Sequence, residues 1–445
     1  MTDKMDDKID EDFSSSYADD PDVQSVIEAV DSGAPLVFIL GRAGTGKTTL
    51  IKHIIARDKD TAQVVLAPTG VAALNARGQT IHSFFRLPTR VLDEEALSQK
   101  RSNKLWRKID RVIIDEISMV RVDVLDAIDF VLKRARRDPR PFGGVQLVLV
   151  GDFLQLPPVA PRKEAEMLSH MGYSSPFVFS ANIVQNSSPK FVRLTTVHRQ
   201  TDPYFVDILS LIRDRVNLDV ALSELNKACF QNHRPMRKPM ILTGTNARAS
   251  HYNEAGLRAI ELDAKTFTGK ATGTFELKQG RPPAPEHLAL KPGARVMAIK
   301  NDPQGRWVNG SLGTVKSLAP NHVSVIFDID GKARKVERAS WENIRYQWDA
   351  GQEKIEADVV GAYSQFPLIL AWAATIHKAQ GLTLDDVRVD LERGAFASGQ
   401  TYVAISRART MAGLSFTRAL RPSDIIVDQV LTEFEHWIDD LQIGN

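Results

Sequence analysis

The sequence of 445 residues contains a single cysteine, Cys229, so the chain by itself can form no disulfide bond. We expect Cys229 to be a small buried apolar residue, and the scarcity of cysteine fits an intracellular setting. No group of cysteines and histidines has the spacing of a zinc site. No apolar run approaches the ~18 residues that a membrane helix needs. The sequence therefore predicts neither a disulfide scaffold, nor a zinc module, nor a membrane-spanning protein.

Net charge is also small, at +2, but it is unevenly distributed. Residues 1–20 hold eight acidic side chains against two lysines, which leaves +8 for the remainder of the chain. We expect a disordered acidic tail over residues 1–20, with no signal or transit peptide, ahead of a basic body. A basic body permits the binding of nucleic acid without proving it.

The most informative segment is a complete G-x-x-x-x-G-K-[ST] phosphate-binding loop, Gly41-Arg42-Ala43-Gly44-Thr45-Gly46-Lys47-Thr48. An apolar run typical of a buried strand precedes it, and a segment with helical spacing of apolar residues follows. Glycines let backbone N–H groups close around phosphate oxygens, and the helix N-terminus adds a favourable dipole. We expect Lys47 to reach the β- and γ-phosphates and Thr48 to bind magnesium.

Short apolar runs alternate with helical segments along much of the chain, which is typical of parallel sheets covered by helices on both faces. In the first region the predicted strands are Leu36–Leu40, Ala62–Ala67, Arg111–Ile114 and Gln146–Val150, with Phe191–Leu194 just after. A second region begins near residue 191 and shows strands at Met240–Thr243, Leu368–Trp372 and Val387–Leu391. The predicted fold class is therefore α/β.

Two stretches interrupt this alternation. Residues 86–108 are basic and include Trp106, which we expect to be a packed residue of a small insertion. Residues 264–363 show short β-like runs and turn residues, which predict an inserted β-barrel. Its expected strands are Ala294–Ile299, Gly313–Val315, His322–Phe327 and Lys332–Glu337. The chain then divides into a tail (1–20), a first lobe (21–190), a second lobe (191–263 and 364–445) and the β insertion (264–363).

Polar side chains follow two of the predicted strands of the first lobe. The strand at 111–114 ends in Asp115 and Glu116, where Asp115 can hold magnesium through water and Glu116 can orient or deprotonate the attacking water. The strand at 146–150 is followed by Gln155, which could contact the γ-phosphate. Taken alone, Gln155 would be interpreted as a loop amide that satisfies the backbone. Together with the phosphate loop, the two acids favour an ATP hydrolase.

Other classes of nucleotide hydrolase fit poorly. A GTPase would need an N-K-x-D motif that reads guanine, and Asn226-Lys227-Ala228-Cys229 lacks the aspartate. The sequence also contains no L-S-G-G-Q stretch of the transporter type.

The motifs as a set resemble the superfamily-one helicases, and within them the PIF (petite integration frequency) family of 5′-to-3′ DNA helicases. The resemblance runs from about Gln24 to Arg409, and the stretch from Met119 to Gly144 resembles the family signature. The segments that carry it, besides the phosphate loop, are Ala67–Ala73, Thr80–Phe84, Asp115–Met119, Gly151–Pro158, His198–Gln200, Thr375–Gly381 and Tyr402–Arg409.

The resemblance implies two RecA-like P-loop lobes that bind ATP and Mg²⁺ between them, with a small wedge insertion in lobe one and an SH3-like β-barrel insertion in lobe two. It implies that Arg199 and Arg407 act as arginine fingers, although either alone would be interpreted as a surface ion pair. The implied catalytic residues are Lys47, Glu116, Gln155, Arg199 and Arg407. The implied nucleotide-binding residues are Gln24, Gly41, Ala43, Gly44, Thr45, Gly46, Lys47, Thr48, Thr49 and Gln380, and the metal-binding residues are Thr48 and Asp115.

For DNA, the resemblance implies contacts from Thr69, Gly70, His82, Ser83, Phe84, Asn246, Thr375, His377 and Lys378. Backbone N–H, hydroxyl and cationic groups suit phosphates. Phe84 could stack on a base, which is worth ~1–3 kcal/mol, or could equally be a core aromatic.

These observations predict an ATP-dependent 5′-to-3′ DNA helicase that translocates on single-stranded DNA. Two alternatives remain: an ATP-gated single-strand-binding or remodelling protein, and the motor subunit of a larger recombination complex. The expected partners are single-stranded DNA and tailed or forked duplex DNA, with G-quadruplexes as a further candidate and no membrane. We expect a monomer when free, and a cytoplasmic, nucleoid-associated location in a bacterium.

Overall fold

The computed structural model describes residues 20–69, 72–73, 76, 78–88, 90–92, 97, 103–197, 200, 202–231, 239–275, 282–349 and 354–443. The side chains at 344, 347–349, 354–357 and 441–443 lie outside this description. Of the residues expected to form sites, Gly70 and Arg199 lie outside the described residues, as do residues 1–19 of the acidic tail. Within the described part, no helix is long and apolar enough to cross a lipid bilayer.

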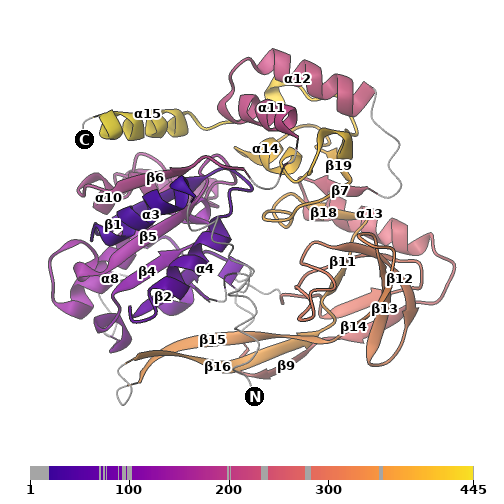
Figure 1. The fold of residues 1–445 in the computed structure, drawn as a ribbon, viewed down its shortest axis with the longest axis horizontal. Coiled ribbons are helices and arrows are strands. Elements are labelled where there is room, and N and C mark those ends of the chain that lie inside the picture. Colours follow the sequence, from indigo (N-terminus) through magenta and orange to yellow (C-terminus); the bar gives the residue numbers. More distant parts are fainter. Residues whose placement is uncertain are drawn as a thin grey trace.

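Lobe one is built on a six-stranded sheet in which every pair of neighbours is parallel, in the order β3-β2-β4-β5-β1-β6. Alternate residues along each strand face two different apolar cores, as Val37 and Phe38 do in β1. Helices α3 and α4 cover one face and α8 covers the other (Figure 1). The strands are β1 (Leu36–Gly41), β2 (Gln63–Ala67), β3 (Gln79–Thr80), β4 (Arg111–Ile114), β5 (Gln146–Gly151) and β6 (Lys190–Leu194); the helices are α3 (Pro21–Asp31), α4 (Lys47–Arg57) and α8 (Val122–Arg136).

Strand β6 is the edge strand of this first sheet, because Phe191 pairs with Phe38 of β1 in parallel register. The sequence placed Phe191–Leu194 at the start of the second lobe. The sheet of lobe one thus continues past residue 190. A short apolar strand that could pair with either sheet carries no local signal of its partner, which is why its place was not predicted.

Lobe two is built on a smaller parallel sheet in the order β18-β7-β19-β20. The expected strand at Met240–Thr243 is confirmed as β7, and the one expected at Val387–Leu391 is β19 (Val387–Asp390). Helices α11, α12 and α14 share one apolar core with this sheet. The remaining elements are β18 (Ala373–Thr375), β20 (Leu414–Phe416), α11 (Pro203–Asp214), α12 (Leu218–Asn226), α13 (Asn246–Arg258) and α14 (Gln400–Ile405).

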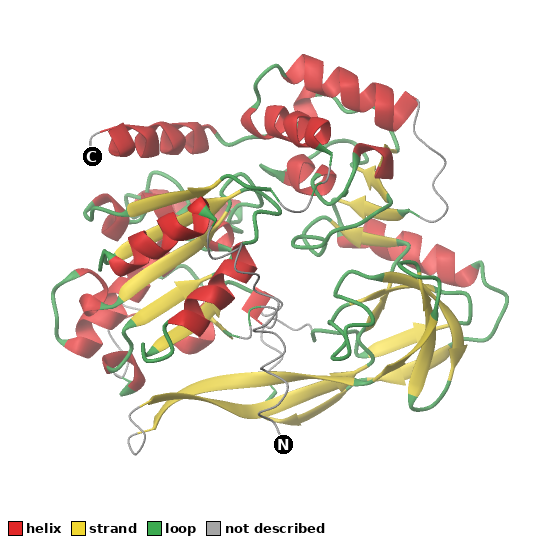
Figure 2. Ribbon diagram, viewed as in Figure 1, coloured by secondary structure: helices red, strands yellow, loops and turns green. Residues whose placement is uncertain are grey.

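Between β7 and β18 lies a five-stranded antiparallel sheet with its own core, in the order β14-β13-β12-β11-β17. Figure 2 shows this part of the molecule as strands and loops beside the helix-covered lobes. Its strands are β11 (Arg295–Ala298), β12 (Leu312–Leu318), β13 (His322–Phe327), β14 (Ala333–Glu337) and β17 (Leu368–Leu370). The single strand expected at Leu368–Trp372 is therefore two strands, because β17 pairs with β11 and only β18 returns to the parallel sheet.

A long hairpin extends from this antiparallel sheet to lobe one (Figure 1). It consists of β15 (Ala339–Asp349) and β16 (Lys354–Gln365), with β9 (Lys270–Gly273) on its other edge. Tyr346 of β15 reaches the lobe-one core, where its ring lies 6.0 Å from that of Phe84 in an edge-on arrangement. The β insertion and lobe one are therefore in direct contact.

The C-terminal helix α15 (Gln429–Ile443) follows lobe two in sequence but packs on lobe one (Figure 1). Phe434 stacks on Phe179 with ring centroids 4.1 Å apart, and Arg193 of β6 forms ion pairs with Glu435 and Asp439. The sequence had assigned 364–445 to the second lobe. An amphipathic pattern predicts a helix but not the surface that it covers, so this docking was not predicted.

The other elements are short. They are α6 (Ile81–Phe84), α9 (Arg162–His170), α10 (Asn182–Gln185), the pair β8 (Lys265–Thr268) and β10 (His287–Leu290), a π-helical turn (Lys227–Gln231), and 3₁₀ turns at Leu105–Arg107, Ile117–Met119, Pro141–Gly144, Val178–Ser180, Met411–Gly413 and Pro422–Asp424. Trp106, in the first of these turns, is buried against Phe85, as expected for a packed residue of the basic insertion.

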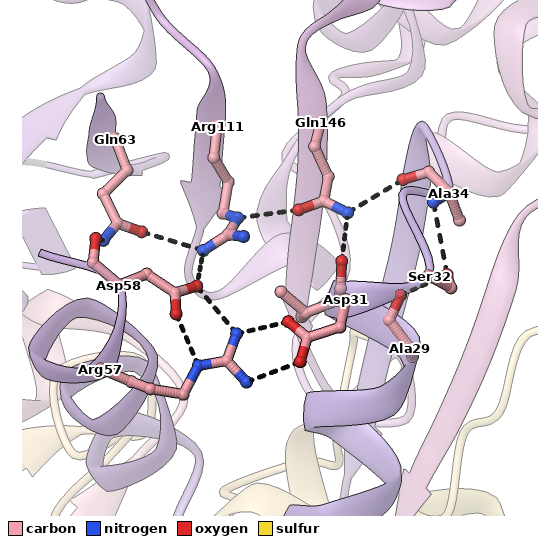
Figure 3. A network of polar contacts seen from close by, with 10 residues as sticks. Ala29, Asp31, Ser32, Ala34, Arg57, Asp58, Gln63, Arg111 and Gln146 are labelled. Atoms are coloured by element: carbon pink, nitrogen blue, oxygen red, sulfur yellow. Dashed lines mark hydrogen bonds and ion pairs between the residues drawn. The ribbon is translucent and has the colours of Figure 1, made fainter. Parts of the chain in front are cut away.

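At the edge of the first sheet where β2, β4 and β5 begin, a polar network fixes the ends of α3 and α4 (Figure 3). Arg57 of α4 donates to Asp31 of α3 and to Asp58, and Arg111 of β4 also donates to Asp58. Arg111 reaches Gln146 of β5 through an Nε–Oε1 hydrogen bond of 2.7 Å. Because this network holds the C-terminal end of α4, the N-terminal end of the helix is fixed at the opposite edge of the sheet.

Candidate nucleotide site and nucleic-acid interface

The phosphate loop joins β1 to α4 and has the backbone that its glycines predict. Gly46 caps α4 with a φ of 78°, a left-handed conformation that glycine adopts without strain. A Cβ atom on Gly41 would lie only 2.4 Å from Oγ1 of Thr45, so the loop also needs glycine there. Nζ of Lys47 donates to the carbonyl oxygens of Gly41 and Arg42 at 2.7 and 2.8 Å. Lys47 therefore lies inside the loop, at the positive end of α4.

Thr48 and Thr49 lie exposed in the first turn of α4, beside the loop. Asp115 and Glu116 follow β4 two strands away, at the same edge of the sheet. Burial, and then the neighbouring Glu116 carboxylate, raise the pKa of Asp115 to about 7, while Lys47 acts in the opposite direction. The backbone N–H of Glu116 donates to Asp115 at 2.8 Å. The two carboxyl groups thus lie side by side near Lys47 of the phosphate loop, which favours the ionised form of Asp115.

Glu116 is also the point where lobe two meets this site. Its φ of 53° is unusual for a residue with a side chain and costs on the order of 1–3 kcal/mol, which surrounding contacts must offset. Nε2 of Gln380 donates to Oε2 of Glu116 at 2.9 Å. The predicted nucleotide-binding glutamine of one lobe and the predicted water-activating carboxylate of the other are therefore hydrogen-bonded.

Gln155 follows β5 and is buried at the same edge. Its Nε2 atom donates to Oδ2 of Asp152 at 3.0 Å. Gly399, which caps α14 of lobe two, lies so close that a Cβ atom there would be 2.3 Å from the carbonyl oxygen of Gln155. The loop that carries Gln155 is therefore in tight contact with lobe two.

Lobe two also contacts the phosphate loop itself. Arg42 donates to Oγ of Ser210, and the hydroxyl of Tyr402 lies within hydrogen-bonding reach of the Ala43 backbone. Burial raises the pKa of Tyr402 to about 12, and Asp152 acts in the same direction. A small pocket at this junction is lined by Arg42, Ala43, Val197, Gln200, Val206, Leu209, Ser210, Arg213, Tyr402 and Ser406.

Two other predicted nucleotide residues, Arg407 and Gln24, have contacts of their own. Arg407 follows α14 and is 1% exposed, and its guanidinium donates to the carbonyl of Val403 in that helix and to Oγ of Ser406, the C-cap of the helix. Gln24 is exposed on the first turn of α3. Its neighbour Asp22 accepts hydrogen bonds from the N–H groups of Thr195 and Thr196, which places Gln24 near the segment that leads to Arg199.

The residues predicted to contact DNA form two groups, one on each lobe. Thr69 follows β2, and His82 and Ser83 follow the neighbouring strand β3, so all three lie at the carboxyl edge of the first sheet. Asn246 begins α13 after β7, while Thr375 ends the neighbouring strand β18 and precedes the exposed His377 and Lys378. Each group thus lies at the sheet edge where ligands bind in parallel α/β folds.

Phe84 differs from the other members of its group because its side chain is buried, at 4% exposure. Its ring packs edge-on against Phe85, with centroids 4.8 Å apart, and against Tyr346 of the long hairpin. The sequence left two roles open for Phe84, stacking on a base or packing in the core. In this conformation Phe84 packs in the core. Stacking of Phe84 on a base would require the hairpin to move.

The comparisons with known proteins agree with this arrangement. Residues 20–203 match the family model of the PIF1-like helicases. The ATP-dependent DNA helicase Pif1 of Bdellovibrio bacteriovorus is 34% identical over 430 residues, which cover 95% of this chain and 92% of that protein.

The chain belongs to the PIF1-like helicase family.

Solved structures of this family extend the likeness to the fold. Bacteroides Pif1 in complex with ADP-AlF4 is 34% identical in sequence and superposes with a TM-score of 0.85. The match covers 94% of this chain and 97% of the Bacteroides chain. Bacteroides Pif1 bound to single-stranded DNA superposes with a TM-score of 0.69 over 95% and 97% of the two chains. Six eukaryotic relatives are longer, and this chain covers 57% to 62% of their lengths. Like the family, the chain is an ATP-hydrolysing DNA helicase.

The donor atoms at the site suit magnesium. The hydroxyl of Thr48 and the carboxylate of Asp115 are hard oxygen ligands of the kind that Mg²⁺ prefers. Burial, and then the Glu116 carboxylate, raise the pKa of Asp115 to about 7, and a dication bound here would oppose both effects. Within the described residues no cluster of three or more Asp, Glu, His or Cys side chains could hold a metal. Phosphate oxygens and water would therefore complete the coordination of any ion here.

Sequence reasoning assigned no role to three residues at the junction of the lobes: Asp152, Arg213 and Tyr402. Asp152 and Tyr402 stand inside motifs that were recognised, Gly151–Pro158 and Tyr402–Arg409, so position in a motif was the available signal. Arg213 had no such signal, because one arginine at the end of an amphipathic helix is ordinarily a solvated charge.

Proposed function

We propose that the chain is a motor that moves 5′ to 3′ along single-stranded DNA, with ATP and Mg²⁺ bound between its two lobes. The observation that carries this proposal is the junction at the carboxyl edge of the first sheet. There the phosphate loop, Glu116 and Gln155 follow three neighbouring strands, and Gln380 of lobe two is hydrogen-bonded to Glu116. Nucleotide bound at this edge would be contacted by both lobes, so its hydrolysis would change how they fit together.

In this proposal the loop from Gly41 to Thr49 encloses the phosphates, and Lys47 moves from the loop carbonyls to the β- and γ-phosphates. Thr48 and Asp115 hold Mg²⁺, which supplies charge neutralisation on the phosphates. Glu116 orients and deprotonates the attacking water, and Gln155 contacts the γ-phosphate. Asp115 is suited to this role because a nearby dication favours its ionised form.

Arg199 and Arg407 are proposed to act as arginine fingers from lobe two. For Arg407, this requires the guanidinium to exchange its contacts with Val403 and Ser406 for a phosphate oxygen as the lobes close. Its burial favours that exchange, because a charge in a low-dielectric environment interacts strongly with a phosphate. Gln24 is proposed to read the adenine, and Gln380 to sense the nucleotide through Glu116.

Single-stranded DNA is proposed to lie across the carboxyl edges of both sheets. Thr69, Gly70, His82 and Ser83 would contact it on lobe one, with Phe84 fixing the turn beneath them. The contacts on lobe two would come from Asn246, Thr375, His377 and Lys378. Residues 86–108 would form the wedge, and residues 264–363, which supply four of the five strands of the antiparallel sheet, the SH3-like domain beside the DNA.

Tailed and forked duplexes are the proposed substrates, with G-quadruplexes as a further one. The protein is proposed to be a monomer when free and to be located in the bacterial cytoplasm, associated with the nucleoid. Strand-displacement assays on matched 5′- and 3′-tailed duplexes, with ATP and magnesium, test the direction of movement. We expect the 5′-tailed duplex to be opened and the 3′-tailed one to stay largely intact. Efficient opening of the 3′-tailed duplex alone would overturn the proposed polarity. ATP-dependent binding without opening of either duplex would favour a remodelling protein instead.

A further inference from the structure

A buried ion pair joins the two lobes beside the nucleotide site. Asp152 follows β5 of lobe one, and Arg213 lies in the last turn of α11 of lobe two. The side chain of Asp152 is 1% exposed and that of Arg213 is 17% exposed, and Nη2 of Arg213 lies 3.6 Å from Oδ1 of Asp152. A buried carboxylate is unfavourable unless a partner compensates its charge, and Arg213 is such a partner for Asp152.

Asp152 in turn holds Gln155, the residue proposed above to contact the γ-phosphate. Oδ2 of Asp152 accepts a hydrogen bond from Nε2 of Gln155 at 3.0 Å, and Oδ1 accepts one from the N–H of Leu154 at 3.2 Å. An ionised carboxylate can only accept hydrogen bonds. The amide of Gln155 must therefore turn its NH2 group towards Asp152 and its Oε1 atom elsewhere.

The groups that face this pair come from three elements. Arg213 also donates to Asp214 at 2.9 Å, while its Nε atom is buried with no hydrogen-bond partner among the residues that the structure describes. Burial lowers the pKa of Arg213, but Asp152, Tyr402, Asp214 and Glu435 together raise it above its ordinary value. Tyr402 is neutral near pH 7, because its pKa is raised to about 12. Arg213 is thus the cation that faces Asp152 from lobe two in this set of contacts.

We propose that Arg213 is a positioning residue, whose contact with the Asp152 carboxylate holds that group in place and thereby orients the amide of Gln155 for ATP hydrolysis. This inference rests on the role proposed for Gln155. Since Arg213 and Asp152 belong to different lobes, the orientation of Gln155 would depend on how closely the lobes approach. Hydrolysis would then be slow whenever lobe two is displaced, even with ATP fully bound.

The test is a double-mutant cycle, read as DNA-stimulated ATPase activity of the full chain with saturating single-stranded DNA. We expect Arg213→Met, which keeps the bulk but not the charge, to lower kcat by about 10- to 100-fold, as substitutions of residues that orient a functional side chain do. The KM for ATP should change by less than about threefold, because the contacts that bind ATP remain. Gln155→Ala should cause a similar loss, and the double variant should lose no more than the worse single variant.

Two further variants separate positioning from a general loss of structure. Arg213→Lys retains the positive charge and should recover most of the lost kcat. Arg215→Met changes an exposed arginine at the end of the same helix and should leave kcat unchanged. If Arg213→Met shows no cooperative thermal transition, and so does not fold, the test is made by comparing the kcat of Arg213→Lys with that of Gln155→Ala.

The proposal is wrong if folded Arg213→Met retains the kcat of the unchanged protein. It is also wrong if folded Arg213→Lys loses as much kcat as Gln155→Ala does, or if the losses of kcat in the two single variants multiply in the double variant. A Gln155→Ala variant with undiminished kcat would refute the role proposed for Gln155. In that case any loss of kcat in Arg213→Met would have another cause. This outcome distinguishes a failure of the role proposed for Gln155 from a failure of the role proposed for Arg213.

Discussion

At the scale of single residues, Lys47 offers the clearest separation of ATP hydrolysis from DNA binding. Its Nζ atom lies inside the phosphate loop, bound to the carbonyls of Gly41 and Arg42. The predicted DNA contacts follow other strands. We expect Lys47→Ala to abolish ATP hydrolysis, because the γ-phosphate loses its cation and Asp115 loses a group that favours its ionised form. Affinity for single-stranded DNA should remain within about threefold, which is under ~1 kcal/mol.

Phosphate release and fluorescence anisotropy with a labelled oligonucleotide measure the two properties. Lys52→Ala, on an exposed position of the same helix, is the matched control. Hydrolysis by Lys47→Ala at the rate of the control would show that the phosphate loop does not act as described.

Residue-level prediction from the sequence succeeded where a motif fixes geometry and stopped where a contact crosses between lobes. The phosphate loop needs its glycines for backbone reasons that are local, so Gly41, Gly46 and Lys47 lie where the pattern implies. The contact between Gln380 and Glu116 joins residues far apart in the chain, and no local pattern encodes it. Arg213 went unrecognised for the same reason.

At the scale of elements, the network at the far end of α4 makes a prediction about acid. Hydrogen bonding from Arg57, and then from Arg111, lowers the pKa of Asp58 against the opposing effect of burial. A carboxyl group whose pKa is lower in the folded state contributes stability above its unfolded pKa, near 4, and loses that contribution as pH falls through the folded value. We therefore expect Asp58→Asn to be destabilised at pH 7 and to approach the unchanged protein as pH falls below about 4.

Thermal melts from pH 7 to pH 3 measure this difference. Asp60→Asn, on an exposed residue two positions away, is the control and should melt like the unchanged protein throughout. An Asp58→Asn variant whose deficit stays constant across this range would show that the network acts through shape and not through charge.

Helix α15 makes a second prediction at this scale. Phe434 is 3% exposed and contacts the rings of Phe179, Phe153 and Phe191, all of lobe one. Truncation of a buried phenylalanine costs ~3–5 kcal/mol. We expect Phe434→Ala to be destabilised by about 3 kcal/mol in denaturant unfolding. His436→Ala, exposed on the same helix, should change stability by less than about 0.5 kcal/mol. Equal stability of the two variants would show that α15 is not docked on lobe one.

The sequence predicted most strands but not their partners. Continuous apolar runs and flanking turns were enough to locate β1, β4, β5, β7 and β13 within a residue of their bounds. The same signals could not assign β6 to the first sheet, divide 368–375 between two sheets, or dock α15 on lobe one. Strand partners and helix docking depend on tertiary contacts, which periodicity does not record.

At the scale of the whole molecule, the distribution of charge predicts how DNA binding responds to salt. The chain beyond the acidic tail carries +8, and exposed His377 and Lys378 lie at the sheet edge predicted to face DNA. Binding through phosphates releases counterions, so the logarithm of the affinity should fall linearly with the logarithm of salt concentration. We expect a slope of roughly −0.7 for each phosphate contacted by a single strand.

Lys378→Ala should make this slope less negative by about 0.7, because one phosphate contact is lost. Lys163→Ala, on an exposed residue of α9, should leave the slope unchanged. Anisotropy titrations in which the salt concentration is raised about sixfold, from about 50 to about 300 mM, resolve this difference in slope. An affinity that does not vary with salt would indicate binding dominated by base stacking, and the basic body would then have no part in holding the strand. An equal change of slope in both variants would mean that charge acts through the field of the whole molecule and not through contacts at the edge of the second sheet.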